Sequence, residues 1–480
     1  MQEAGRGLHA SDVGRVGVKI LVKCYASRIR IRDVFHSVTN LSSIDSPTAR
    51  IVPRADHTIS RQRISKHALT VLYRLKDAGF RACLVGGGVR DLLLGREPKD
   101  FDVVTDARPE EVRALFRNCR LVGRRFRLAH VYFREDVVEV STFRGGHDGE
   151  DDAGKVAEDG RILRDNVYGT LEEDVWRRDF SVNALYYDIE DFSLIDYADG
   201  LADLEAGRLR MLGDAEARYH EDPVRMLRAV RFAAKLGFRM DEATETPLFH
   251  LGELLEPIPA ARLYEEVLKL FQSGHGAASF ELLRHYDLLR RLLPAVDAQL
   301  CRDRDEGRVH KLVRLALEST DQRVAEGLPV NPAFLFAALL WEPVRAAYER
   351  NMAEHEPWGD ALRHAADEVL DAVVRRVAIP KRVTLMIRDI WFLQPRFSQR
   401  GGRREAGLGA HERFRAGVDF LCLRAESGEP LRGDCDYWRE IEESVPSRTH
   451  AHTHAPAHEG GERERKPRRR SGFRRRPRGG

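Results

Sequence analysis

The sequence predicts an α+β protein, in which a mixed α/β region precedes an almost wholly helical region and a low-complexity basic tail. Short apolar runs alternate with helical patterns over residues 59–142. Beyond residue 237, apolar residues recur at helical spacing up to about residue 425. The last 35 residues or so hold a His/Ala/Thr tract and then an arginine-rich segment. With 480 residues and 42% hydrophobic content, the chain has room for about three domains and a sizeable core.

The mixed region opens with a helical pattern over residues 59–79, which Gly79 ends. The last two strands expected after it stand close enough together to form a hairpin. In chain order we expect a strand at 82–85, a helix at 89–94, a strand at 101–104, a helix at 109–119, and strands at 130–133 and 137–142.

The next stretch begins with a polar, glycine-containing segment at residues 145–160, which predicts a mobile loop. Residues 172–187 return to helical spacing. A short strand pair at 193–197 and 208–212 follows, and then a strong helix at 223–236.

The charge of the chain is distributed unevenly. The 79 basic and 76 acidic residues leave a net charge of +3, but residues 463–480 contain ten Lys or Arg residues and one Glu, which gives them +9. Residues 1–462 therefore carry 3 − 9 = −6. An acidic body with a strongly basic tail predicts a polyanionic partner for the tail.

Composition also argues against several other classes of protein. The longest apolar stretch, residues 333–341, has nine residues, whereas roughly 20 are needed to span a bilayer. The six cysteines form no CxxC pair, so we expect neither a disulfide framework nor a cysteine-type zinc site, as in a reducing cytosol. Residues 1–50 contain no convincing secretory signal and are interpreted as a poorly ordered extension.

The densest chemical signal is a run of three glycines, Gly86 to Gly88, between the expected strand at 82–85 and the helix after it. Glycines at such a place let the backbone approach a phosphate closely, although neither a Walker nor a dinucleotide motif is present. Asp100 and Asp102 follow at the head of the next strand, where residues two apart face the same side. Two carboxylates at one point repel each other unless a cation lies between them, so they are candidate Mg²⁺ ligands.

A third carboxylate would complete a site for two-metal nucleotidyl transfer. Glu139 lies in the middle of the expected strand at 137–142, either on a solvated face or at the site. Asp179 is the other candidate, and in the predicted helix Asn183 shares its face one turn later. The alternative for Asp179 is an ordinary ion pair on a helix surface.

The segment from Glu221 to Gly237 predicts a helix with a basic stripe. Asp222 is its expected N-cap, and Gly237 its C-terminal stop. Arg225 and Arg228 belong to the basic stripe, opposite an apolar stripe that packs. Arginine in such a stripe is either solvated or suited to phosphate and base edges.

Together these segments resemble the class II nucleotidyltransferases of the polymerase-β superfamily, which comprise bacterial poly(A) polymerases and tRNA CCA-adding enzymes. The resemblance rests on the glycine and DxD motif (86–102), the RRDFxxN segment (177–183) and the EDPVRMLRAxRF segment (221–232). Residues 121–131, with the sequence LVGRRFRLAHV, resemble the segment that marks the poly(A) polymerase branch.

The resemblance implies a polymerase-β-like nucleotidyltransferase head with a mixed sheet, all-helical neck and body domains, and a disordered basic tail. The implied boundaries are 1–50 for the extension, 51–200 for the head, 201–275 for a nucleotide-selecting neck, 276–425 for an RNA-binding body and 426–480 for the tail.

The resemblance also assigns roles to residues. Asp100 and Asp102 would hold Mg²⁺, Asp179 would belong to the active site, and Glu139 competes with Asp179 as the third metal ligand. The remaining candidates would contact the triphosphate, select the base or otherwise bind the nucleotide: Gly86, Gly87, Arg90, Arg178, Asn183, Asp222, Arg225 and Arg228.

The predicted reaction is template-independent addition of AMP from ATP to RNA 3′ ends, which promotes RNA turnover. We expect a cytoplasmic, monomeric enzyme, with RNA 3′ ends and ATP as substrates, RNA-decay proteins as further partners and no membrane association. One alternative is a tRNA CCA-adding enzyme, against which the basic tail and the segment from Gly123 to Phe126 argue. Another, of a different class, is a non-catalytic RNA-binding adaptor.

Overall fold

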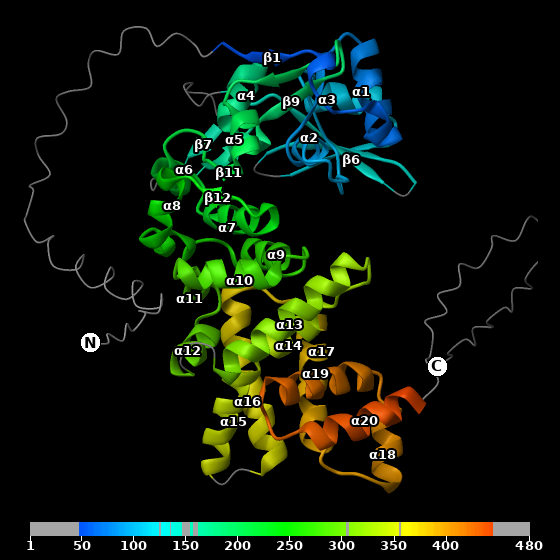
Figure 1. Cartoon of the computed structure of the whole chain (residues 1–480), viewed down its shortest axis with the longest axis vertical. Helices are drawn as coiled ribbons and strands as arrows, with labels where there is room; N and C mark the ends of the chain where they lie inside the picture. The colour runs from blue at the N-terminus through cyan, green and yellow to red at the C-terminus, as the bar shows by residue number, and fades with distance from the viewer. Residues whose placement is uncertain are drawn as a thin grey trace, which may run out of the picture. The chain divides into compact units, whose positions relative to one another are not determined.

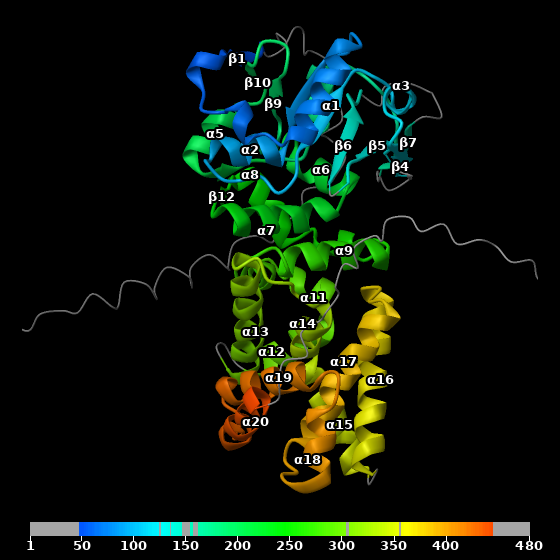
Figure 2. The same cartoon turned by 90° about the vertical axis from the view of Figure 1, so that its right-hand side faces the viewer.

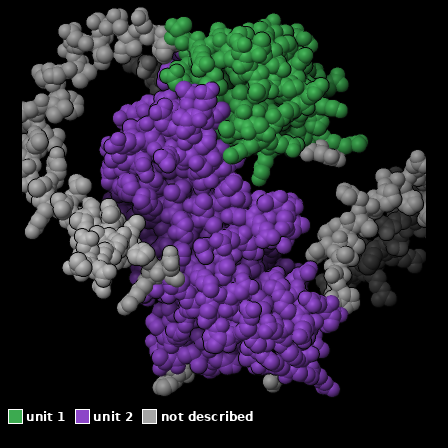
Figure 3. Space-filling view, in the orientation of Figure 1, with its two compact units in different colours: residues 1–121, 128–143, 183–201 green, residues 122–127, 144–182, 202–480 purple. Residues whose placement is uncertain are grey.

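The structure, a computed structural model, describes residues 48–444 except 124–125, 135, 146–153, 157–161, 304–306 and 355–356. Most of the N-terminal extension, much of the loop predicted at 145–160, the His tract and the arginine-rich segment lie outside these residues. The chain divides into two compact units (Figure 3). Unit 1 comprises Met1–Leu121, Leu128–Phe143 and Asn183–Leu201, and unit 2 comprises Val122–Arg127, Arg144–Val182 and Ala202–Gly480. The five predicted domain boundaries stay a prediction.

Unit 1 is built on a mixed sheet, as predicted, with the strand order β1-β10-β9-β2-β3-β6-β5-β4. Strands β2 and β3 pair antiparallel, β3 and β6 pair parallel, and β5 and β6 form the predicted antiparallel hairpin. The strands are β1 (Arg50–Val52), β2 (Ala82–Val85), β3 (Asp102–Thr105), β4 (Cys119–Val122), β5 (Leu128–Tyr132), β6 (Val137–Thr142), β9 (Leu185–Asp188) and β10 (Leu194–Asp196).

Three helices cover strands of this sheet (Figures 1 and 2). Helix α1 (Lys66–Asp77) packs on β2, β3 and β6, whereas α2 (Gly87–Leu93) packs on β2 and β9, and α3 (Pro109–Leu115) on β5 and β6. Helix α1 starts later than residue 59 because Ser65 caps it by accepting a hydrogen bond from the backbone of Ala68. Ahead of the cap lie two short 3₁₀ turns, η1 (Arg54–Asp56) and η2 (Arg61–Arg63).

The prediction of one helix over residues 172–187 is wrong beyond residue 177, where the observed helix ends. Helix α4 (Leu171–Arg177) begins with a capping box of Thr170 and Glu173 and ends at Arg177. It is followed by the 3₁₀ turn η3 (Ser181–Asn183) and then by β9, a fully buried strand in the sheet. A buried apolar run has no polar alternation, so its spacing cannot separate strand from helix. Asp179 and Asn183 therefore share no helix face, and they belong to different units.

The strand pair predicted from residues 193–197 and 208–212 is also wrong. Strand β10 pairs with β1 and β9 in unit 1. Strand β11 (Arg208–Leu209) pairs in parallel with β12 (Arg239–Met240). Both predicted strands exist in shortened form, but each finds a partner from another part of the chain.

Unit 2 is predominantly helical, as predicted. Helix α7 (Val224–Leu236) ends where predicted, at Gly237, whose φ of 72° is a left-handed conformation suited to glycine. The other helices are α5 (Gly200–Ala206), α6 (Ala215–Glu221), α8 (Glu242–Glu245), α9 (Ala260–Phe271), α10 (Gly276–His285), α11 (Leu288–Leu292), α12 (Pro294–Arg302), α13 (Arg308–Ala325), α14 (Pro332–Leu339), α15 (Trp341–Ala353), α16 (Trp358–Arg376), α17 (Lys381–Leu393), α18 (Gly402–Gly409), α19 (Phe414–Ser427) and α20 (Arg432–Ser444). The 3₁₀ turns are η4 (Thr246–Phe249), η5 (Gly252–Leu255) and η6 (Gln394–Arg396), and a two-stranded sheet joins β7 (Gly154–Val156) to β8 (Ile162–Asp165).

The expectation that the cysteines form no disulfide is wrong for one pair. Cys422 on α19 and Cys435 on α20 are disulfide-bonded, although 13 positions separate them in the sequence. The two helices pack against each other, and this packing, which no cysteine spacing motif encodes, brings the sulfur atoms together. Among the described helices, none is both long enough and apolar enough to cross a membrane.

Candidate active site

The glycine bend connects β2 to α2 and packs against the segment that carries Asp100. Gly86 has φ 77° and ψ −141°, a conformation that other residues rarely adopt. A Cβ atom added at Gly88 would lie 3.2 Å from the backbone oxygen of Asp100 and 3.5 Å from the ring of Phe101. The bend therefore needs glycine both for its turn and for its close approach to residues 100–101.

The two candidate metal-binding aspartates lie beside this bend. Asp102 is the first residue of β3 and pairs with Val85, the last residue of β2, directly ahead of Gly86. Asp102 is half-buried, and Asp100, which precedes the strand, is exposed. The predicted proximity of the carboxylates to the bend is thus present within unit 1, although the strand begins one residue later than expected.

Glu139 shares a face of the sheet with Asp102. The parallel register of β3 and β6 pairs Val103 with Val140, so Asp102 and Glu139 stand one residue earlier on adjacent strands. The carboxylate of Glu139 is half exposed, and its Oε1 lies 3.4 Å from Nε2 of His130. Of the two candidate third carboxylates, Glu139 is the one that belongs to the same unit as Asp100 and Asp102.

Arg90, which is predicted to face the triphosphate, is buried and paired with protein groups in this structure. Its side chain is 1% exposed, and its guanidinium donates to Oδ1 of Asp91 at 2.7 and 2.9 Å and to Oδ1 of Asn183 at 2.5 Å. A guanidinium held in this way is not open to a phosphate. Arg90 and Asn183 instead tie the helix after the bend to the segment ahead of β9.

Asp179 and Arg228, two of the predicted site residues, form a close ion pair in unit 2. Arg228 donates from Nε and Nη2 to Oδ2 of Asp179, with the Nε bond at 2.8 Å. The backbone N–H of Phe180 donates to Oδ1 of Asp179, which is 9% exposed. Burial disfavours the charged form of Arg228, but the Asp179 carboxylate outweighs burial and raises the pKa of Arg228. The alternative of an ion pair on a helix surface is thereby excluded for Asp179.

Arg218, which sequence reasoning missed, lies with Arg225 around Glu221. Oε2 of Glu221 accepts hydrogen bonds from Arg218 at 2.6 Å and from Arg225 at 2.8 Å. Arg218 also donates to the backbone oxygens of Arg177 and Arg178. Burial, followed by the positive charge of Arg225, lowers the pKa of Arg218 to about 10. No motif marks Arg218, because these backbone partners lie about 40 positions away in the sequence.

Asp174 forms ion pairs with two further arginines of unit 2. Its carboxylate, 1% exposed, accepts from Arg178 at 2.9 Å and from Arg144 at 3.0 Å. Arg144 and Arg177 also lower the pKa of Arg218 through their charge. We call Arg144, Arg177, Arg178, Arg218 and Arg225 the arginine cluster; its acidic partners named here are Asp174 and Glu221.

Asp222 lies between α6 and α7, where it is the C-cap of α6, and the predicted N-cap position of α7 is taken by Pro223 instead. The Oδ1 of Asp222 accepts a hydrogen bond from the backbone N–H of Val224, the first residue of α7, at 3.3 Å. Its Oδ2 accepts from Arg262 at 2.7 Å. Asp222 and Arg225, at 9% and 8% exposure, are nearly buried rather than displayed on a solvated stripe.

A groove of about 770 Å³ opens beside Asp100, wholly within unit 1. Its lining includes the exposed side chains of Lys66 and Lys99, for which we find no acidic partner within the described residues. Arg63 also lines the groove and donates to the backbone oxygens of Leu92 and Arg96. The groove thus combines a candidate catalytic carboxylate with cations that can bind phosphate.

The donor types in unit 1 fit a magnesium ion. Carboxylates and water are the ligands that Mg²⁺ prefers; Asp102 and Glu139 stand side by side on adjacent strands, and Asp100 lies just ahead of the first strand. Within the described part of the chain, however, no three His, Cys, Asp or Glu side chains are already grouped as a metal site.

Three family models match this chain over most of its length. Residues 82–210 match "Poly A polymerase head domain", residues 237–300 match "Probable RNA and SrmB- binding site of polymerase A", and residues 354–476 match "Polymerase A arginine-rich C-terminus". The first match contains the glycine bend and the carboxylates described above.

Similar proteins are found in several bacteria. The chain is 48% identical to poly(A) polymerase I of Escherichia coli O157:H7 over 84% of its own length and 88% of that protein, and 46% identical to poly(A) polymerase I of Haemophilus influenzae over 82% and 88%. It is 40% identical to a CCA-adding enzyme of Lactobacillus helveticus, over only 45% of this chain and 52% of that protein.

Among solved structures, the fold resembles the Bacillus stearothermophilus CCA-adding enzyme in complex with CTP. The TM-score is 0.52 at 27% identity, covering 79% of this chain and 82% of that one. The Thermotoga maritima CCA-adding enzyme complexed with tRNA has a TM-score of 0.53 at 18% identity, over 82% and 86%, which supports the fold alone.

Proposed function

Because this chain belongs to the bacterial poly(A) polymerase I family, we propose that Asp100 and Asp102 form the catalytic centre of its RNA-extending reaction. The chain is a polynucleotide adenylyltransferase, which adds AMP from ATP to RNA 3′ ends without a template. One observation carries the assignment of the centre: Asp102 is paired with the residue that precedes the glycine bend, and the bend packs on Asp100.

In this reaction the RNA 3′ oxygen attacks the α-phosphate of ATP, and pyrophosphate leaves. Asp100 and Asp102 would hold Mg²⁺, with Glu139 as the third carboxylate, since the sheet register favours Glu139 over Asp179. When bound, Mg²⁺ supplies Lewis acidity to the attacking hydroxyl and neutralises charge on the triphosphate. The glycine bend leaves room for the phosphates beside these carboxylates.

Unit 2 carries two residues that are proposed to select the base. Asp222 and Arg225 are paired with Arg262 and Glu221 in this structure, and we propose that they exchange these contacts for the edge of adenine when they select it. Asp179 would act mainly by holding Arg228, since both of its oxygens already accept hydrogen bonds from protein groups.

The groove beside Asp100 would receive the RNA strand. Lys66, Lys99 and Arg63 would contact its phosphates, and the strand would end with its 3′ hydroxyl at the carboxylates. The ten basic residues at 463–480 would add sequence-independent affinity that weakens as salt is raised. RNA-decay proteins as partners, a monomeric state and a cytoplasmic location stay predictions.

Two experiments test the activity against its alternatives. Incubation with CTP, ATP and a tRNA lacking its CCA end should give continued addition of A, whereas ordered addition of C, C and A that then stops would indicate a CCA-adding enzyme. Wild-type protein that fails to extend RNA in the presence of Mg²⁺ and ATP would indicate an RNA-binding adaptor instead.

A further inference from the structure

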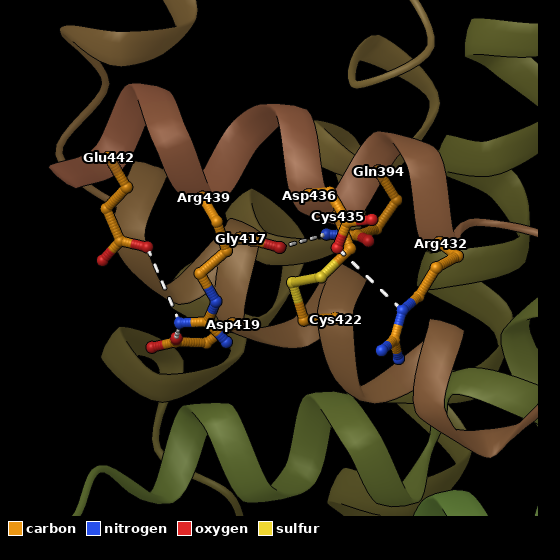
Figure 4. The surroundings of a disulfide bond; sticks show 9 residues. All are labelled: Gln394, Gly417, Asp419, Cys422, Arg432, Cys435, Asp436, Arg439 and Glu442. Carbon is orange, nitrogen blue, oxygen red and sulfur yellow. Dashed lines mark hydrogen bonds and ion pairs between the residues drawn. A yellow bond between two sulfur atoms is a disulfide. The ribbon is translucent and has the colours of Figure 1, made fainter. Parts of the chain in front are cut away.

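A disulfide bond joins α19 and α20, the last two described helices. Cys422 on α19 is 1% exposed and Cys435 on α20 is 9% exposed, and their Cα atoms are 5.0 Å apart (Figure 4). Both lie in an apolar cluster with Leu421 and Trp438. The sulfur atoms are therefore placed to bond whenever α20 is docked on α19.

We propose that Cys422 and Cys435 form a reversible thiol–disulfide site that controls how firmly α20 is clamped to the helical body. The predicted compartment, the cytoplasm, keeps most thiols reduced, so a disulfide there depends on the redox state of the surrounding thiol pool. In the sequence, residues 445–462 separate α20 from the arginine-rich segment at 463–480. The clamp therefore acts on the last described helix ahead of that segment.

Other contacts keep α20 docked when the bond is open. Trp438 packs edge-on against Phe397 and Phe414, and its Nε1 donates to the backbone oxygen of Phe397 at 2.7 Å. Arg439 on α20 also pairs with Asp419 on α19 (Figure 4). Because these contacts do not involve sulfur, the thiols stay close together after reduction and can bond again.

The redox partner is glutathione disulfide, and the chemistry balances in two exchanges. The Cys435 thiolate, the more exposed of the two, attacks one sulfur of glutathione disulfide and releases one glutathione, which leaves a mixed disulfide. The Cys422 thiolate then attacks the sulfur of Cys435 and releases the second glutathione. The two protons lost by the cysteines go to the two departing glutathione thiolates, and two electrons pass from the protein to the reagent.

The test equilibrates the full-length chain in buffers of graded glutathione to glutathione disulfide ratio. After acid quenching and alkylation, mass spectrometry of the peptides that contain Cys422 and Cys435 reports the oxidised fraction. Hydrogen exchange of the α20 amides and the unfolding temperature report the clamp. The Cys422→Ser and Cys435→Ser variants remove the bond, and Cys301→Ser is the matched control, because Cys301 is exposed and unbonded.

We expect the oxidised fraction to follow the glutathione ratio in both directions in wild type and in Cys301→Ser. Oxidation should raise the unfolding temperature by roughly 5–10 °C and slow exchange in α20, because it closes a short loop. Neither serine variant should respond. The proposal is overturned if both thiols stay free in fully oxidising buffer, if the bond resists reduced glutathione in the folded protein, or if oxidation changes neither exchange nor unfolding temperature.

Discussion

Gly88 and Asp100 are in close contact, because a Cβ atom at Gly88 would lie 3.2 Å from the backbone oxygen of Asp100. Few Cβ atoms approach a backbone oxygen so closely, so a side chain at position 88 must displace the segment that carries the candidate metal-binding aspartates. The glycine of this motif thus sets the position of a carboxylate 12 residues later, besides shaping the bend that would receive the phosphates.

Gly88→Ala should therefore slow RNA extension about tenfold or more, since shifts below 1 Å are costly at a reacting centre. The unfolding temperature should change little, because alanine favours helix formation at this position in α2. Gly359→Ala is the control: a Cβ atom there meets nothing within 4 Å. Equal extension rates for Gly88→Ala and wild type would show that the contact does not position Asp100.

Arg228→Met should destabilise unit 2 by about 2–4 kcal/mol, because it leaves the nearly buried carboxylate of Asp179 without its charged partner. Urea unfolding at pH 7 measures this change. Arg375→Met, on an exposed arginine of α16, should have little effect. In the Arg228→Met background, Asp179→Asn should recover part of the lost stability, since it removes the uncompensated charge. No recovery would mean that the pair is not coupled.

The unfolding free energy should depend on pH through Glu221. Burial would raise the pKa of Glu221, but Arg218 and Arg225 outweigh burial and lower it below 4.5. The unfolded state then binds the proton more readily, so Glu221 stabilises the fold above its unfolded pKa, and this contribution is lost as pH falls through the folded pKa. Urea unfolding between pH 3 and 6 should show a shallower pH dependence for Glu221→Gln than for wild type. An unchanged slope would contradict the arginine pairing.

Lys66 and Lys99 should bind the RNA backbone if the groove holds the substrate strand. The double variant Lys66→Gln/Lys99→Gln should weaken RNA binding and reduce the slope of log affinity against log salt by about 0.7 for each lost phosphate contact. Lys76→Gln, at the other end of α1, should keep the wild-type slope. A double variant with wild-type affinity and slope would place the RNA elsewhere.

The glycine bend and its neighbouring elements could be predicted because their signals are local. Strand β2 lies between a glycine that ends the preceding helix and the glycine bend, and α7 ends at Gly237. The error over residues 172–187 has a physical cause: the fully buried strand β9 lacks the polar alternation that identifies a half-buried strand.

The contacts that support the site could not be predicted from local patterns. Arg218 donates hydrogen bonds to backbone oxygens about 40 positions away in the sequence. Arg90 donates to Asn183, which lies 93 positions away. From the sequence alone, a basic residue in a motif that binds a ligand cannot be distinguished from one that pairs with an acidic side chain of the protein. Burial, which separates the two for Arg90, arises only when the sheet forms. The same holds for Cys422 and Cys435, which tertiary packing brings together.

The most direct test of the catalytic centre is extension of a short RNA with each of the four nucleotides separately, in Mg²⁺, by wild type, Asp102→Asn and Asp371→Asn. Asp371 is exposed on α16 and provides the matched control. Wild type and the control should extend RNA with ATP preferentially, and Asp102→Asn should extend it more than about 100-fold more slowly. Substituting a residue that only supports a metal ligand lowers activity about 10- to 100-fold, and loss of the ligand itself should lower it further. An Asp102→Asn protein that polyadenylates at the wild-type rate would contradict the account.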